Sequence, residues 1–230
     1  MDYDGELVAG TAKKLIGNLI VDVELNDGKI EPAFCGAVEV ADMCKQGMPV
    51  LLLREADDTR ILKNKLLFLK TSGGWIFADP KYNRALFKEA FVAKKIEELR
   101  PYKSCRALKH SEAKGIDFEL TGENGEKAFV FVTSIYNKKD GCAAFPQKMN
   151  FFEMKMLEEM RHKINKGAKV FIMMIAPRED CDKAKFSWDI DPLAAAAMYD
   201  AAQFGINFIC YNCKIEENNI SLHQKMRIIY

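Results

Sequence analysis

The first third of the chain alternates between short apolar runs and turn residues. Apolar and polar positions alternate within several of these runs, as in strands that are buried on one face. Asn26-Asp27-Gly28 and Ser72-Gly73-Gly74 are typical of hairpin turns, because they tolerate the left-handed backbone of a tight turn. Five strands within about sixty residues favour a small barrel, and an OB-type barrel is the common solution at this size. The predicted strands are residues 19–25, 29–31, 49–53, 65–70 and 75–78.

After Asp79-Pro80 the pattern changes to helices that alternate with strands. Asp followed by Pro is typical of an N-cap and the first position of a helix. Helical spacing of apolar residues predicts helices that end near Arg100-Pro101, at Gly167 and at Gly205, the third beginning at Asp191-Pro192. The predicted strands are residues 116–120, 127–135, 170–176 and 206–211, and the apolar helical positions include Leu86, Phe87, Ala90, Phe91, Ala93, Phe151, Phe152, Met156, Leu157 and Met160.

These two patterns predict two domains. Residues 1–80 are expected to form an OB-like β-barrel domain, and residues 81–230 an α/β domain with a mixed sheet flanked by helices. The predicted fold class is therefore α/β with a β-barrel as its N-terminal domain.

One hairpin of the second domain carries the most specific signal. Residues 115–120 and 127–135 are predicted strands joined by a glycine-bracketed turn of hairpin length. Because side chains alternate along a strand, Asp117 and Glu119 are expected to share one face. The opposite face is then apolar and consists of Ile116, Phe118 and Leu120.

An Asp on one strand beside a strand with Glu-x-Lys resembles the core of PD-(D/E)XK nucleases, whose carboxylates hold Mg²⁺ and whose lysine helps to activate water. Here Phe131 and Thr133 stand where that core has Glu and Lys. Phenyl rings offer no ligand to a Mg²⁺ ion that has lost its water. We therefore expect a nuclease-like fold with no catalytic residue and no metal site, Asp117 being the one retained position. The bland interpretation of Asp117 and Glu119 is a solvated strand face.

Over nearly the whole chain, short motifs resemble those of the sugar fermentation stimulation protein A (SfsA) family in order and spacing. Val-Asp-Val at residues 21–23 before Asp27-Gly28 is similar to the family's Ala-Asp-Val before an Asp-Gly turn. Residues 84–90 resemble its Asn-Arg-Leu-x-Lys-Glu-Ala helix start, with the arginine displaced by one place. Ile-Asp-Phe at residues 116–118 and Phe145-Pro146 match two further segments. The chain is thus identified as a divergent member of this family.

Several polar residues of the family pattern are missing. Residues 34–38 stand where the family has Cys-Pro-Asn-Thr-Gly, residues 131–133 where it has Glu-Val-Lys, and residues 145–148 where it has Phe-Pro-Asp-Ala. The resemblance implies an OB-like N-terminal domain, DNA binding and a link to the regulation of sugar metabolism. The missing residues indicate that the chemistry of the family's site is lost here.

Composition narrows the class of protein without identifying a function. With 49% hydrophobic and 29% charged residues, the chain resembles an ordinary soluble globular protein. Its apolar runs are shorter than the about 20 residues that a bilayer requires, and its acidic start lacks the features of a signal peptide. The sequence contains no glycine-rich phosphate loop, so no nucleotide cofactor is predicted.

The seven cysteines do not form a recognisable framework of disulfides or metal ligands. Their odd number and irregular spacing favour reduced thiols and a cytoplasmic location. Cys210 and Cys213 form a lone Cys-x-x-Cys, and they point to opposite faces if the strand continues through both. No zinc site is therefore predicted.

The net charge of +1, from 34 basic and 33 acidic residues, gives no support for a nucleic-acid-binding surface. Local clusters of cations and aromatic residues are nevertheless candidates, because OB barrels bind single strands along basic grooves that contain aromatic rings. Such clusters are also typical of solvated faces. The predicted nucleic-acid-binding residues are Arg60, Lys63, Lys65, Lys81, Arg84, Lys103, Arg106 and Lys109.

The sequence leaves three hypotheses open. The leading one is a non-catalytic protein that binds nucleic acid, above all DNA. The second is a Mg²⁺- or Mn²⁺-dependent nuclease with displaced ligands, in which Asp117 acts with Glu119 or Glu112. The third is a protein-interaction module on a degenerate nuclease scaffold, which the eleven methionines would suit. DNA is the expected partner, a protein is the alternative, no membrane is involved, and the oligomeric state is left open.

Overall fold

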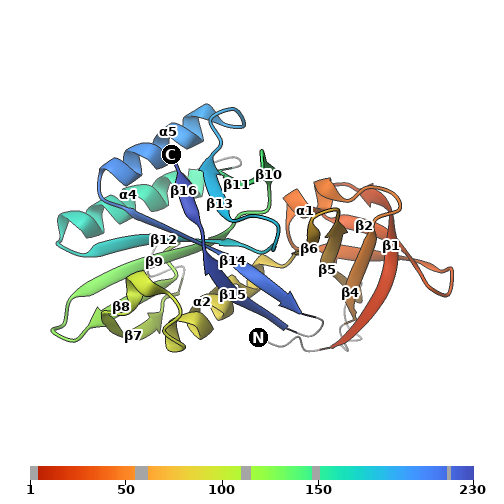
Figure 1. The fold of residues 1–230 in the computed structure, drawn as a ribbon, viewed down its shortest axis with the longest axis horizontal. Helices are drawn as coiled ribbons and strands as arrows, with labels where there is room; N and C mark the ends of the chain where they lie inside the picture. Colours follow the sequence, from red (N-terminus) through yellow and green to blue (C-terminus); the bar gives the residue numbers. More distant parts are fainter. Residues whose placement is uncertain (1–4, 55–61, 110–114, 147–150, 217–218) are drawn as a thin grey trace. The chain divides into compact units, whose positions relative to one another are not determined.

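The computed structural model describes residues 5–54, 62–109, 115–146, 151–216 and 219–230, and its elements are labelled in Figure 1. The chain forms two compact units. The first contains the chain up to Tyr82 together with two later segments, residues 177–180 and 214–220, and the second contains the rest. The two later segments are far from Tyr82 in the sequence, but they pack with the first unit.

The first unit is built around a closed barrel. β1 pairs antiparallel with β2 and β4, β2 pairs with β3, and β4 pairs with β5. The parallel pair of β3 and β5 closes the barrel, and β6 extends from β5. This order of five strands is that of an OB-like barrel, so the prediction is confirmed. The elements are β1 (Glu6–Ile16), β2 (Ile20–Leu25), β3 (Ile30–Cys35), α1 (Val38–Met43), β4 (Pro49–Arg54), β5 (Asn64–Thr71) and β6 (Gly74–Phe77).

β1 is the element of the barrel that the sequence did not predict. The five predicted strands correspond to β2–β6, although β1 lies between β2 and β4. The middle of β1 contains the small residues Ala9, Gly10 and Ala12 and therefore has no apolar run. Close packing requires the glycine, because a Cβ at residue 10 would lie 2.4 Å from Cγ1 of Val23. The signal for a strand is weak here because the barrel has room only for small side chains.

The second unit contains a six-stranded mixed sheet in the order β15-β14-β12-β9-β8-β7. β7, β8 and β9 are antiparallel, whereas β9, β12 and β14 are parallel. Four short strands form a second sheet in the order β10-β11-β13-β16. The strands are β7 (Tyr102–Ala107), β8 (Phe118–Gly122), β9 (Lys127–Ser134), β10 (Lys138–Lys139), β11 (Cys142–Phe145), β12 (Lys169–Ala176), β13 (Lys183–Phe186), β14 (Asn207–Glu216), β15 (Asn219–Lys225) and β16 (Arg227–Ile229).

Helices cover both faces of the six-stranded sheet (Figure 1). α2 (Asn83–Val92) lies on one face, where the rings of Phe87 and Phe118 are 4.7 Å apart between centroids. α4 (Phe151–Asn165) and α5 (Pro192–Gln203) lie on the other face, over the main apolar core. A mixed sheet flanked by helices is therefore confirmed. None of the described helices is both long and apolar enough to span a membrane.

The N-terminal signals of two helices have different outcomes. Asp191 is the N-cap of α5, since its Oδ1 accepts a hydrogen bond from the Ala194 amide at 2.9 Å. Asp79 also accepts such a bond, from the Lys81 amide at 3.1 Å, but it opens a 3₁₀ turn (Pro80–Tyr82). α2 follows this turn and does not begin at the predicted proline. The side chains of Phe151 and Phe152, and residues 147 and 148, lie outside the described part of the chain.

The end of α2 corrects a second expectation. The helix ends at Val92, well before the predicted end near Arg100. Lys94 follows in the left-handed conformation with φ of 54°, and its amide bonds the carbonyl of Phe91 at 3.0 Å. Glycine is the usual residue in this position after a helix, because a Cβ costs about 1 kcal/mol there. The sequence has Lys and not Gly at the stop, so the stop was not recognisable.

We expect Lys94→Gly to raise the free energy of unfolding by about 0.5–1 kcal/mol, because it removes the strained Cβ. Urea denaturation followed by circular dichroism measures the change. Lys95→Gly is the matched control, since it removes the same charge from a neighbouring residue that lacks a positive φ. It should lower the free energy of unfolding by a similar amount, because glycine adds backbone entropy to the unfolded chain. Equal effects of the two changes would contradict the strain.

Candidate functional site

Asp117 lies just before β8 and is buried, with 4% of its surface exposed. Its Oδ1 accepts a hydrogen bond from Nη1 of Arg84 at 2.8 Å, and its Oδ2 accepts one from the amide of Val132 at 2.8 Å. The interpretation as a solvated strand face is therefore wrong. Both carboxylate oxygens have a partner within the protein, as a buried carboxylate requires.

Arg84 connects the first turn of α2 to two segments of the chain, the end of β7 and the entry of β8. Besides its ion pair with Asp117, its Nη2 donates to the carbonyl of Leu108 at 2.8 Å and to that of Asp117 at 3.2 Å. The guanidinium also lies 5.1 Å from the ring centroid of Phe118. This predicted nucleic-acid-binding arginine thus places its charge on a carboxylate and its donors on carbonyls of the same unit.

The predicted division of the strand into two faces holds only from Phe118 onwards. Ile116 packs into the core under α4, whereas Phe118 contacts α2 on the other side of the sheet. The regular strand begins at Phe118, after Gly115 with a φ of 97°. The predicted alternation begins at residue 115, where the chain has not yet entered the sheet. Ile116 therefore does not share a face with Phe118, contrary to the prediction.

The described residues around Asp117 do not offer the ligands of a divalent cation. Phe131 on β9 packs against the core under α4, and the neighbouring Ser134 hydroxyl donates to Oδ1 of Asn83 at 2.8 Å. The guanidinium of Arg84 occupies the coordination direction of Asp117 Oδ1. Among the described residues, no group of three His, Cys, Asp or Glu side chains could hold a metal ion. Glu112, the alternative ligand, lies outside the described residues.

Glu119 is also engaged within the sheet. Its carboxylate accepts hydrogen bonds from Lys127 Nζ at 2.6 Å and from Arg106 Nη2 at 2.7 Å. The hydrogen bond from Lys127, with a smaller contribution from Arg106, holds the pKa of Glu119 below its usual value. Glu119 therefore stays ionised and neutralises cations of two strands.

The predicted cations of the barrel have different environments. Lys65 is buried and ion-pairs with Asp79, and its ammonium lies 5.8 Å from the ring centroid of Tyr82. Lys63 and Lys81 are exposed. Arg60 lies outside the described residues. Of these four, only Lys63 and Lys81 are seen to present a charge to solvent.

The predicted cations of the second unit belong to a longer basic segment, residues 83–109. This segment contains eight Lys or Arg and three Glu, a surplus of five positive charges in a chain whose net charge is +1. Lys103, Arg106 and Lys109 were predicted from their neighbouring aromatic residue. The exposed cations that the prediction missed are Lys88, Lys94, Lys95 and Arg100, and the local charge balance was the signal that could have found them.

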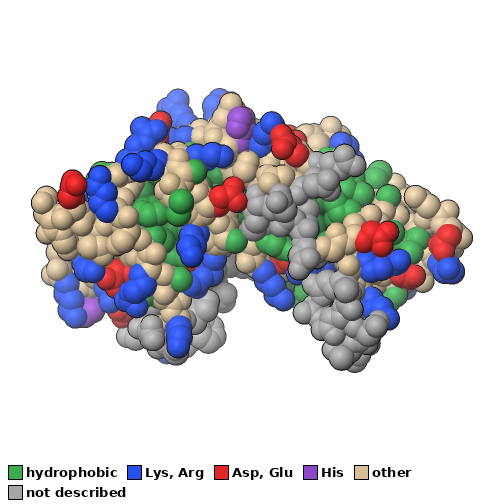
Figure 2. All heavy atoms as spheres, turned by 90° about the horizontal axis from the view of Figure 1, so that it is seen from below, with side chains coloured by type: hydrophobic (Ala, Val, Ile, Leu, Met, Phe, Trp, Pro, Cys, Tyr) green, Lys and Arg blue, Asp and Glu red, His purple; other side chains and the backbone are tan. Residues whose placement is uncertain are grey.

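Most cations of the basic segment are available to solvent. Figure 2 looks onto the side of the second unit on which α2 lies, and Lys and Arg side chains are spread over it. Seven of the eight cations are exposed, Arg84 being half-buried. Burial raises the pKa of the Cys105 thiol to about 11, and the nearby charges of Lys88 and Arg84 oppose this shift. α2 and β7 together therefore carry a positive surface.

Comparison with known proteins gives a consistent result. The family described as "Sugar fermentation stimulation protein RE domain" matches residues 81–219. A sugar fermentation stimulation protein homolog of Maricaulis maris is 30% identical, over 99% of this chain and 98% of that protein. One of Paramagnetospirillum magneticum is 26% identical, over 96% and 95%. The solved structure of Pyrococcus furiosus SfsA in complex with Ca²⁺ has a TM-score of 0.85 at 16% identity, over 100% and 98%.

The ion pair of Arg84 and Asp117 is expected to stabilise the second unit strongly. Arg84→Met leaves a buried carboxylate without its cation and should lower the free energy of unfolding by about 2–4 kcal/mol. Asp117→Asn keeps an acceptor for the Val132 amide and should cost less. In the double variant, the loss should fall short of the sum of the single losses by at least about 1 kcal/mol. Urea denaturation measures all four chains, and additive losses would contradict the coupling.

Proposed function

The chain belongs to the sugar fermentation stimulation protein family, and we propose that it binds nucleic acid, above all DNA, without cleaving it. The observation that carries the proposal is the basic segment of residues 83–109. Its exposed cations Lys88, Lys94, Lys95, Lys103 and Lys109 form no ion pair with any described residue. Cations without a carboxylate partner can neutralise phosphates and release their counterions, which is the main source of affinity for DNA.

The environment of Asp117 supports the second half of the proposal. Cleavage of a phosphodiester by a metal ion requires carboxylate ligands with open coordination positions and a group that activates water. Asp117 is instead saturated by Arg84 and Val132, and Phe131 and Thr133 replace the Glu and Lys of the nuclease pattern. We therefore assign this position a structural role. The proposed link to regulation of sugar metabolism, and a cytoplasmic location, rest on the family alone.

Binding to a short DNA duplex should weaken steeply as salt rises, since each neutralised phosphate contributes about −0.9 to the slope of log K against log salt. The triple variant Lys88→Gln, Lys95→Gln and Lys103→Gln should bind more weakly and reduce the magnitude of this slope by about 2–3. Fluorescence anisotropy of a labelled duplex measures both quantities.

The matched control for this experiment removes the same charge from another part of the second unit. Lys155, Lys166 and Lys169 are exposed on α4, in the turn after it and at the start of β12. Their joint change to Gln should leave the slope nearly unchanged. Equal slopes in the two triple variants would contradict the assigned surface, and absence of binding by the unchanged chain at low salt would defeat the proposal.

The non-catalytic part is tested by incubating plasmid and single-stranded DNA with the protein and Mg²⁺, Mn²⁺ or no metal. Ca²⁺ is included because the Pyrococcus protein is described in complex with it. We expect the unchanged chain and Asp117→Asn to leave the DNA equally intact, because neither offers a metal an open set of ligands. Metal-dependent cleavage that Asp117→Asn abolishes would instead establish the nuclease hypothesis.

A protein-interaction module is the second candidate function, and the surface near α5 favours it. Leu193 is 84% exposed, and the exposed rings of Trp188 and Tyr199 lie 6.0 Å apart between centroids. Groups of exposed apolar side chains are typical of protein-binding surfaces. A chain that is fully folded and yet fails to bind DNA at low salt would favour this function over the first.

A further inference from the structure

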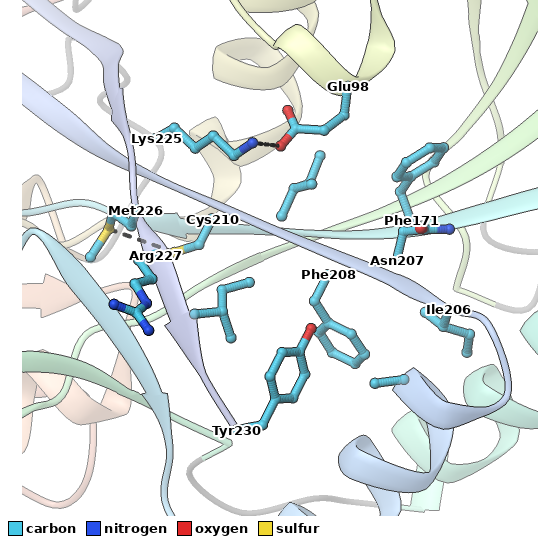
Figure 3. A pocket seen from close by; sticks show the side chains of 13 residues that line it. Glu98, Phe171, Ile206, Asn207, Phe208, Cys210, Lys225, Met226, Arg227 and Tyr230 are labelled. Carbon is cyan, nitrogen blue, oxygen red and sulfur yellow. Dashed lines mark hydrogen bonds and ion pairs between the residues drawn. The ribbon is translucent and has the colours of Figure 1, made fainter.

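A pocket of about 420 Å³ lies in the second unit (Figure 3). Its volume is within the range of small-molecule sites. It is formed by β14, the end of β15, β16 and the last turn of α5, with contributions from β12 and the 3₁₀ turn at Glu97–Leu99. None of its lining residues takes part in the contacts around Asp117. The pocket is therefore separate from the site described above.

The inner part of the pocket is apolar and aromatic. Phe208 of β14 and Tyr230 provide rings on the face of the sheet that α5 covers. Phe171 pairs in register with Asn207 and lies on the opposite face. Cys210 and Met226 also line the pocket. Their sulfur atoms lie 3.6 Å apart, and the Met226 amide donates a hydrogen bond to the Cys210 carbonyl at 2.8 Å. Tyr230 lies at the opposite end from Glu98 in Figure 3. The rings of Phe208 and Tyr230 favour a flat apolar occupant, because dispersion contacts grow with matched surface.

The charges around the pocket are unequally compensated. Lys225 pairs with Glu98 at 2.7 Å, and Glu98 also accepts a hydrogen bond from the Tyr211 hydroxyl at 3.2 Å. This pair raises the pKa of Lys225, mainly through its hydrogen bond with Glu98. The side chain of Arg227, on β16, makes no hydrogen bond or ion pair with any described residue. The pocket thus has a neutral pair at one end and one uncompensated guanidinium at its side.

The neighbour of Arg227 in the small sheet increases the positive potential. Lys183 on β13 is the register partner of Arg227, and it too is exposed. Like charges opposite each other on adjacent strands are destabilising. An anion bound in the pocket beside Arg227 would reduce this repulsion, and it would accept charge-assisted hydrogen bonds from the guanidinium. The positive charges of Arg227 and Lys183 therefore predict a negatively charged occupant.

We propose that this pocket binds a small molecule with a flat apolar body and one anionic group, the anion being held by Arg227 and the body by Phe208, Met226 and Tyr230. The ligand class follows from the lining alone: rings and sulfur atoms for the body, one uncompensated guanidinium for the charge. This inference is independent of DNA binding, because it uses none of the cations assigned to the basic segment.

Two probes that share a naphthalene ring and differ in the charge of their substituent test the proposal by calorimetry on the full chain. 2-Naphthoate has the required carboxylate, and 2-naphthylmethanol has the same rings without a charge. The unchanged chain should bind 2-naphthoate at least about ten-fold more tightly, as expected for a charge-assisted contact. Arg227→Met should abolish this preference and leave the affinity for 2-naphthylmethanol nearly unchanged. Lys166→Met, which removes an exposed cation outside the pocket, should keep the preference.

A second variant tests where the apolar body of the ligand binds. Ala202 lines the pocket from α5, so Ala202→Phe should weaken the binding of both probes at least about ten-fold. Thermal unfolding checks that each variant is folded, and the comparison of the two probes on the unchanged chain does not depend on any variant. Absence of 2-naphthoate binding, equal affinity for the two probes, or a preference that survives Arg227→Met would each overturn the proposal.

Discussion

The buried ion pair between Arg84 and Asp117 is the interaction on which the second unit depends. It connects the first turn of α2 to the entry of β8, and through Val132 and Leu108 it reaches two further segments of the chain. The carboxylate of Asp117 is removed from water, and a buried carboxylate is tolerated only when its hydrogen-bonding capacity is satisfied. Here the protein supplies partners for both oxygens of the carboxylate. Asp117 is therefore a structural cross-link within the second unit.

The same principle separates structural cations from cations that are available to a partner. Arg84, Lys65 and Arg106 each have a carboxylate partner, so their charges are largely cancelled at short range. Lys88 and Lys103 have no such partner among the described residues. The chain therefore contains a basic segment although its net charge is near zero, because the acidic residues that balance the total lie in other parts of the chain. A polyanion such as DNA responds to the local surface potential of the protein and not to its net charge.

Sequence patterns predicted the elements well where local chemistry determines them. Turn residues and the Asp191 cap gave the barrel hairpins and the start of α5. They failed where packing between distant segments decides: the middle of β1 is small because Val23 lies against Gly10, and α2 ends at a lysine in a glycine conformation. The burial of Asp117 depends on Arg84, which the sequence alone does not place beside it. No local pattern contains that information, so the charge pairs of the site could not be predicted.

The basic segment and the pocket meet at one residue. Glu98 is one of the three acidic residues of the basic segment, and its carboxylate is also the partner of Lys225 at the rim of the pocket. Its negative charge is thus directed toward the pocket and compensates Lys225. This division leaves the cations of α2 and β7 uncancelled and at the same time leaves Arg227 as the pocket's one uncompensated charge among the described residues. Glu98 therefore contributes to the charge balance of both surfaces.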